Sequence, residues 1–171
     1  MTLDKLNGDI WWQRGVLERK QGRVEDAIKD LKRAIELKPT RIDAHATMAE
    51  CLEDKNDAQG ALGEWQRAVS GDDNKPTWRY RYGKLLLDRG SAADAVKHLA
   101  YAVTEAEKME VHPGWYADVQ FQAGEAYKRT GQRKEAVARF KRFLEIAPTS
   151  SPDRRDAIAA LSDLGAPYGG Q

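Results

Sequence analysis

A recurring pattern of small and apolar residues constrains this chain more than any other feature. An alanine followed by an aliphatic residue appears at Ala27, Ala61, Ala95 and Ala136, with spacings of 34, 34 and 41 residues. Apolar residues follow each alanine at offsets of four and seven, which places them on one face of a helix. A chain with such a repeat folds as a stack of similar helical units, because each unit needs its neighbours to bury its apolar face.

A second helical stretch precedes each of these helices. The residue five positions before the alanine is Gly22, Asn56, Gly90 or Gly131. Glycine and asparagine tolerate the left-handed backbone conformation that closes a helix. The sequence therefore predicts four helical hairpins and an all-α fold.

These features resemble the tetratricopeptide-repeat (TPR) family over about residues 8 to 150. The matching positions of the first repeat are Trp11, Gly15, Ala27, Leu31, Ala34 and Pro39. The resemblance implies one domain over residues 1–164, built as a right-handed superhelical solenoid of antiparallel helix pairs. Arg14 and Glu18 depart from the pattern, since the family usually has apolar groups at these two positions.

Four repeats, a capping helix and a short tail are expected. The predicted repeats are 8–41, 42–75, 76–112 and 115–150, the capping helix is 152–164, and the disordered tail is 165–171. The spacing of 41 adds seven residues, close to two helical turns, so the second helix of the third repeat should be longer. Ala157, Ile158, Leu161 and Leu164 form the predicted apolar stripe of the capping helix.

The resemblance also implies that the first helix of each repeat lines a concave surface that binds another protein or peptide. The groove positions carried over to this chain are Trp12, Val16, Arg19, Thr47, Glu50, Tyr80, Arg81, Lys84, Leu87, Phe121, Gln122, Glu125 and Lys128. Trp12, Tyr80 and Phe121 are the expected anchors, because aromatic side chains often dominate interface energies. A structural role for the same three aromatics is the alternative.

Charge is unevenly distributed, although the net charge is only +1. The repeat 42–75 has three basic and eight acidic residues, whereas its neighbours are net positive. An acidic groove between basic flanks disfavours nucleic acid, and helical-repeat RNA binding is therefore the least favoured reading. The groove positions that clamp chaperone tails in the family offer only Arg81 as a suitable basic residue, so no such clamp is predicted.

The sequence contains no recognisable catalytic or cofactor-binding motif. His45, His98 and His112 lie in separate segments, and none forms a metal-binding pair at helical spacing. Cys51 is interpreted as a small buried residue and not as a nucleophile. We therefore predict no enzyme, no metal and no cofactor.

A single cysteine favours a reducing compartment, and no stretch approaches the roughly 18 apolar residues of a membrane span. The expected location is the cytoplasm, without membrane insertion. Three alternatives stay open. The module could self-associate through Arg14 and Glu18 or through the third repeat, it could belong to a larger bacterial motility or secretion assembly, and it could be a segment of a longer protein.

Overall fold

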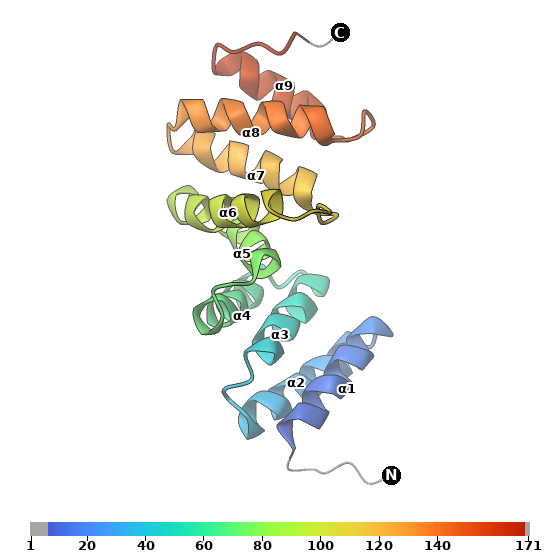
Figure 1. Ribbon diagram of the computed structural model, residues 1–171. Coiled ribbons are helices and arrows are strands. Elements are labelled where there is room, and N and C mark those ends of the chain that lie inside the picture. The colour runs from blue at the N-terminus through green and yellow to red at the C-terminus, as the bar shows by residue number, and fades with distance from the viewer. Residues whose placement is uncertain (1–6, 170–171) are drawn as a thin grey trace. The chain divides into compact units, whose positions relative to one another are not determined.

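The computed structural model describes residues 7–169, and this part of the chain contains helices and no strands (Figure 1). The helices are α1 (Gly8–Lys20), α2 (Val24–Leu37), α3 (Ile42–Asp54), α4 (Ala58–Gly71), α5 (Pro76–Asp88), α6 (Ala92–Glu107), α7 (Tyr116–Arg129), α8 (Arg133–Ile146) and α9 (Arg154–Asp163). The predicted all-α fold is confirmed. The chain divides into two compact units, and the division falls within α5: unit 1 ends at Trp78 and unit 2 begins at Arg79.

In unit 1, α1 packs against α2 and α3 packs against α4, while α2 also contacts α3 (Figure 1). The repeated alanine and the residues four and seven positions after it form the core, and Ala27, Leu31 and Ala34 have no exposed surface. Met48 and Cys51 of α3 complete this cluster. The helical spacing of the apolar residues therefore builds the core that the sequence predicts.

In unit 2, α7 lies between α6 and α8, and α9 packs against α8 (Figure 1). Phe140 is the core residue of α8, and its ring meets the edge of Phe121 at 5.9 Å. Ala160 of α9 is buried, whereas Ile158 is 42% exposed. The expected apolar stripe of α9 is wrong at Ile158, because the helix turns the small Ala160 toward the cluster in its place.

The four loops that close the hairpins share one backbone conformation. Gly22, Asn56, Gly90 and Gly131 all have positive φ angles, as their sequence positions predict. The backbone N–H of the following residue donates to a carbonyl five positions back, and in the first loop the two atoms are 2.9 Å apart. This bond satisfies a carbonyl at the helix end that would otherwise lack a partner.

Glycines also allow three of the hairpins to close tightly. A Cβ added at these glycines would lie 2.8 Å from a side chain of the second helix, and the pairs are Gly15 with Leu31, Gly83 with Leu99, and Gly124 with Phe140. Any larger residue on the first helix would displace the core residue of the second.

The two departures from the family pattern form ion pairs within unit 1. Arg14 binds the carboxylate of Asp30, which is only 4% exposed, and its guanidinium lies 4.5 Å from the centre of the Trp11 ring. Glu18 pairs with Arg23. Polar contacts therefore replace apolar packing at this edge.

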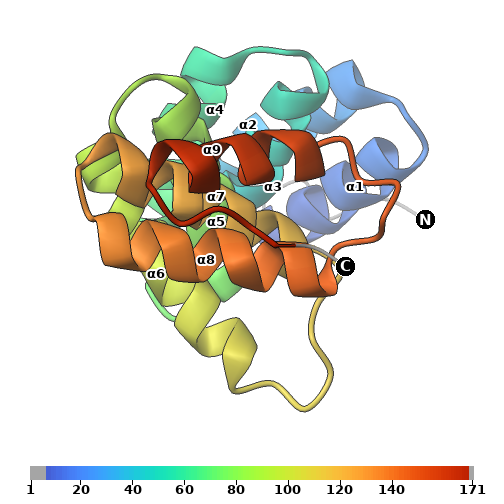
Figure 2. The same cartoon turned by 90° about the horizontal axis from the view of Figure 1, so that it is seen from above.

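The seven extra residues of the third repeat do not all extend its second helix. The α6 helix has 16 residues, two more than α2 or α4, and it ends at Glu107. Residues 108–115 instead form a loop that extends beyond α8 in Figure 2, and Val111 in this loop is 83% exposed. The expectation that the seven added residues lengthen this helix by close to two turns is corrected here.

Residues 165–169 have no regular secondary structure, but they contact the rest of unit 2. Ala166 and Tyr168 pack against the core cluster, and the guanidinium of Arg133 donates to the carbonyl of Leu164 at 2.6 Å. The last two residues of the predicted tail, 170 and 171, lie outside the described residues.

Candidate binding groove

The predicted groove residues of unit 1 contact one another between α1 and α3. The indole Nε1 of Trp12 donates to the hydroxyl of Thr47 at 3.2 Å, and the guanidinium of Arg41 lies over the Trp12 ring at 3.9 Å. Val16 is half-buried one turn further along α1. Trp12 therefore presents only part of its surface, because Arg41 covers one face of its ring.

Arg19 links the two helices at the other end of this surface. Its guanidinium contacts Glu50 at 2.7 Å and Asp54 at 2.8 Å. Burial opposes the charged form of Arg19, but the bond to Asp54 and the charge of Glu50 outweigh it, so the pKa of Arg19 is raised. This pair of carboxylates is already neutralised in part by the protein itself.

In unit 2, the residues from α5 and α7 are gathered around Asp118. The hydroxyl of Tyr80 donates to this carboxylate, and Lys84 and Gln122 reach it at 3.3 and 3.2 Å. The Tyr80 ring also stacks on Trp115, with ring centres 5.1 Å apart. Arg81, the next residue on α5, is half-buried. Three of the predicted groove residues are thus held in place by one carboxylate that the sequence did not single out.

Two of the predicted groove residues are core residues. Leu87 is 1% exposed and Phe121 is 9% exposed, and the Phe121 ring contacts Phe143 at 5.3 Å. Of the three expected aromatic anchors, Phe121 therefore has mainly the structural role that the alternative interpretation gave it.

A hollow of about 470 Å³ lies in unit 2 among the end of α5, α7 and α9. Five of the predicted groove positions line it, namely Leu87, Phe121, Gln122, Glu125 and Lys128, together with Asp88, Arg129, Asp156, Ala159, Ala160 and Asp163. We call it the α7–α9 hollow. Its size falls within the range of pockets that bind small ligands or single peptide side chains.

Acidic groups outnumber basic groups around the α7–α9 hollow. Lys128 pairs with Asp163 at 2.9 Å, and Arg129 lies 3.5 Å from Glu125. No ion pair within residues 7–169 involves the other two carboxylates, Asp88 and Asp156, and both of these residues are exposed. The hollow therefore has negative charge available to a ligand.

Burial is the main influence on the pKa values of Cys51 and His98. Burial raises the pKa of the Cys51 thiol to about 11, so the thiol is neutral at pH 7. Burial likewise lowers the pKa of His98. In the described part of the chain, no three His, Cys, Asp or Glu side chains are grouped as metal ligands, and no helix could cross a membrane.

Comparison with protein families decides what these repeats are. Models of the TPR repeat and the tetratricopeptide repeat match residues 15–54, 47–110 and 118–150. The chain belongs to the tetratricopeptide-repeat family. Proteins of this family are typically protein-binding modules without catalytic activity of their own.

The TPR relatives with curated names are distant. The DnaJ homolog subfamily C member 7 of Mus musculus is 24% identical over 143 residues, and the type IV pilus assembly protein PilF of Pseudomonas aeruginosa is 27% identical over 94 residues. These matches cover 75% and 55% of this chain. The chain spans only 29% of the mouse protein and 37% of PilF.

Solved structures with the same fold cover nearly the whole chain. YrrB, reported as a TPR protein with an unusual peptide-binding site, superposes with a TM-score of 0.83 at 18% identity, over 95% of this chain and 80% of its own. MamA gives a TM-score of 0.77 at 18% identity, over 93% of this chain and 83% of its own. PilW, a type IV pilus biogenesis factor, gives a TM-score of 0.68 at 18% identity, over 93% of this chain and 70% of its own. These likenesses show the fold.

The contribution of α9 to the candidate site was not predicted from the sequence. Asp156 and Asp163 are not among the predicted groove positions, because the family resemblance supplies such positions only for the first helices of repeats. The two aspartates are seven residues apart and thus share one side of α9, on which the buried Ala160 lies between them. This spacing is the sequence signal that could have indicated an acidic surface on α9.

Proposed function

We propose that this chain is a protein-binding module and that the α7–α9 hollow holds a peptide segment of the partner with at least one Lys or Arg. The excess of carboxylates around the hollow supports this proposal most directly. Asp88 and Asp156 contribute charge that no cation of the described chain neutralises. A basic side chain would gain their attraction, while its methylenes would contact Leu87 and Phe121 at the base of the hollow.

The groove residues of α1 and α3 extend the proposal within unit 1. Trp12 and Val16 offer half-buried apolar surface, and Glu50 and Asp54 contact Arg19, which lies about one turn beyond Val16 on α1. The same chemistry, an apolar contact next to carboxylates, would favour basic peptide segments here too.

Selection from a displayed library of random peptides tests this function. The immobilised protein should enrich peptides that contain Lys or Arg, and their affinity should fall with added salt. Reversal of charge in a double variant, Asp88→Lys with Asp156→Lys, should weaken these peptides by about tenfold or more. The matched control is Glu110→Lys, an exposed carboxylate of the 108–115 loop. Selection of peptides without basic residues, or equal binding to the double variant, would contradict the proposal.

A second candidate is a module that promotes the assembly of a larger complex, for example by self-association. PilF is a type IV pilus assembly protein and PilW is a type IV pilus biogenesis factor, and the likeness to both favours this candidate. Leu17 on α1 is 52% exposed and could serve such a contact. Light scattering over a hundredfold range of concentration distinguishes the two, since a peptide-binding monomer keeps a constant mass.

A further inference from the structure

A second hollow of about 500 Å³ lies in unit 1, away from the first-helix surface. We call it the α2–α4 hollow. It is lined by Ile28, Lys32, Ile35 and Glu36 of α2, by His45, Met48 and Leu52 of α3, and by Glu64 and Arg67 of α4. On α3, helical periodicity places these three residues on the side opposite Thr47 and Glu50. A ligand of the α2–α4 hollow would therefore not touch the predicted groove.

The interior of the α2–α4 hollow is apolar. Ile28 and Ile35 lie seven residues apart on α2 and are half-buried, as is Leu52 on α3. Met48 lies beneath them with 4% of its surface exposed. Apolar surface that remains in contact with water gains free energy when a partner covers it.

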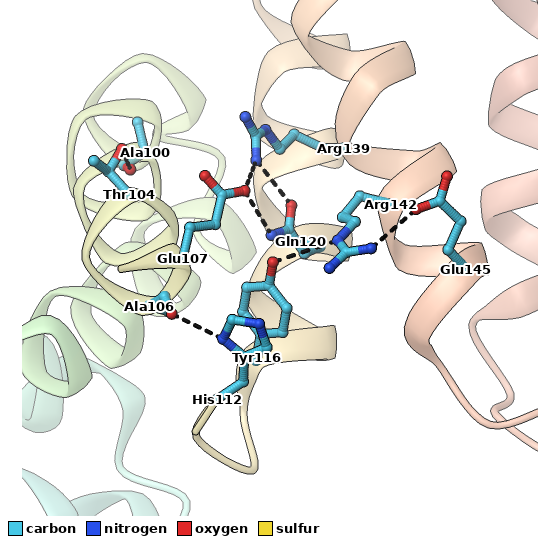
Figure 3. Close-up of polar contacts among 10 residues, drawn as sticks. All are labelled: Ala100, Thr104, Ala106, Glu107, His112, Tyr116, Gln120, Arg139, Arg142 and Glu145. Atoms are coloured by element: carbon cyan, nitrogen blue, oxygen red, sulfur yellow. Dashed lines mark hydrogen bonds and ion pairs between the residues drawn. The ribbon is translucent and has the colours of Figure 1, made fainter. Parts of the chain in front are cut away.

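The corresponding place in unit 2 is closed by side chains of the chain itself. Counted from the repeated alanine, His45 corresponds to Gln120 and Glu64 corresponds to Arg139. Both pairs are in contact, at 2.6 Å in unit 1 and 3.1 Å in unit 2. In unit 2 a residue of the preceding repeat joins them, because Glu107 at the end of α6 contacts the amide of Gln120 and the guanidinium of Arg139 (Figure 3).

The sequence explains why unit 1 lacks this closure. The residue of the first repeat that corresponds to Glu107 is Pro39, which lies beyond the end of α2 at Leu37. The burial of one apolar position differs accordingly. Val103, the counterpart of the half-buried Ile35, is 2% exposed. The difference between the two places therefore arises from Glu107 and its counterpart Pro39 and does not follow from the stacking of repeats alone.

The charges on the walls of the α2–α4 hollow indicate what could occupy it. Glu36 pairs with Arg33 at 2.9 Å, and Glu64 contacts both His45 and Arg67 at 2.6 Å. Both carboxylates of the hollow are thus occupied. The cations are not equally satisfied, because no carboxylate of residues 7–169 pairs with Lys32, and the Arg67 side chain remains 60% exposed.

We propose that the α2–α4 hollow binds an amphipathic helix of a partner protein, with aliphatic or aromatic residues on one face and acidic residues along its edge. The walls are two helices with α3 at the base, which suits a ligand whose apolar residues recur at every third or fourth position. The acidic edge would place a carboxylate beside Lys32 and a second near Arg67. The apolar face would cover Ile28, Ile35 and Leu52.

The methionines allow a direct test with designed probes. The chain has three, and only Met48 lines the hollow, whereas Met109 lies in the 108–115 loop. We would label the methionine methyl groups with ¹³C and add a stapled helix of about 16 residues, long enough for four turns. One probe carries leucines on one face with glutamates along the edge. A second carries lysines in place of the glutamates, and a third has the first composition in scrambled order.

The acidic helix should shift the Met48 methyl signal to saturation and leave the Met109 signal in place. The Lys32→Glu variant should weaken this helix by about tenfold. Lys29→Glu changes an exposed lysine three residues away and should leave the affinity unchanged. The proposal is overturned if the lysine or scrambled helix binds as well as the acidic one, if Met48 does not respond, or if it shifts when the protein alone is concentrated, since a second copy would then be the occupant.

Failure of this proposal is distinguishable from failure of the proposed function. The α2–α4 hollow lies in unit 1 and shares no residue with the α7–α9 hollow of unit 2. Basic peptides selected on the whole protein could therefore bind normally while the acidic helix does not, or the reverse.

Discussion

The two hollows of this protein have opposite chemistry although similar helices build them. The α7–α9 hollow has polar walls with the carboxylates of Asp88 and Asp156, whereas the α2–α4 hollow has an apolar interior and the ammonium of Lys32, and none of these three groups forms an ion pair with residues 7–169. The repeat fold determines where a hollow can form, since it fixes which helix faces meet. A few side chains at equivalent positions then decide whether the hollow is open and which charge it attracts.

The place in unit 2 that corresponds to the α2–α4 hollow is bridged by side chains of the protein itself. Gln120 is completely buried and joins Glu107 to Arg139 between α6 and α8 (Figure 3). A buried polar group in a satisfied network stabilises the surrounding helices, whereas an open apolar surface is available for binding. Unit 2 therefore uses this place for stability, and unit 1 leaves it exposed.

The largest expected effect concerns the thiol that reports on the core of unit 1. Cys51 has no exposed surface, and its pKa near 11 instead of 9 leaves about a hundredfold less thiolate at pH 7 than an ordinary thiol has. Native protein should therefore react with a maleimide at least about a hundredfold more slowly than the urea-unfolded chain. Because the raised pKa disfavours the thiolate, the rate should rise with pH up to about 11. Rapid labelling at pH 7 would show that unit 1 opens readily next to its hollow.

The next effect concerns how much Gln120 in unit 2 and its counterpart His45 in unit 1 contribute to the free energy of unfolding. Gln120→Ala removes a fully buried side chain and its bonds to Glu107 and Arg139, and should lower the free energy of unfolding by roughly 2 kcal/mol. His45→Ala should cost about 1 kcal/mol or less, because Arg67 still neutralises Glu64. Urea denaturation followed by circular dichroism measures both. An equal loss of unfolding free energy in the two variants would show that Gln120 and His45 contribute alike, which would contradict the proposed difference between the units.

A smaller effect is expected when the hollow of unit 1 is filled. The residue that corresponds to Leu52 in the fourth repeat is the larger Tyr127. The substitution Leu52→Tyr should change the stability by about 1 kcal/mol or less, since the added ring enters an existing hollow. It should also weaken the acidic probe helix by about tenfold. Undiminished binding to a variant of normal stability would place the probe elsewhere.

The sequence predicted the repeated part of the fold well because each signal acts locally. The positive φ angles at Gly22 and Asn56 follow from residue type, and the burial of Ala27 and Leu31 follows from helical spacing. The length of α6 was not predictable in this way. Helical phase allowed seven more residues, but the stacking of His112 on Tyr116 and its bond to the carbonyl of Ala106 hold a loop there instead.

The candidate sites were predictable only in part. Family positions identified five of the residues that line the α7–α9 hollow, but not the burial of Leu87 or the role of Asp156, which depend on how α9 packs. The α2–α4 hollow depends on an absence, namely the lack of a counterpart of Glu107 in the first repeat. Such an absence gains meaning only when the two units are compared in three dimensions.

The central claim is that the two hollows bind peptides of opposite charge, and one titration tests it most directly. Methyl groups of alanine and methionine would be labelled with ¹³C, so that Ala159 and Ala160 report on the α7–α9 hollow and Met48 reports on the α2–α4 hollow. The account predicts that a selected basic peptide shifts only the two alanine signals and that the acidic helix shifts only Met48. A single peptide that shifts both sets, or an exchange of the two responses, would contradict it.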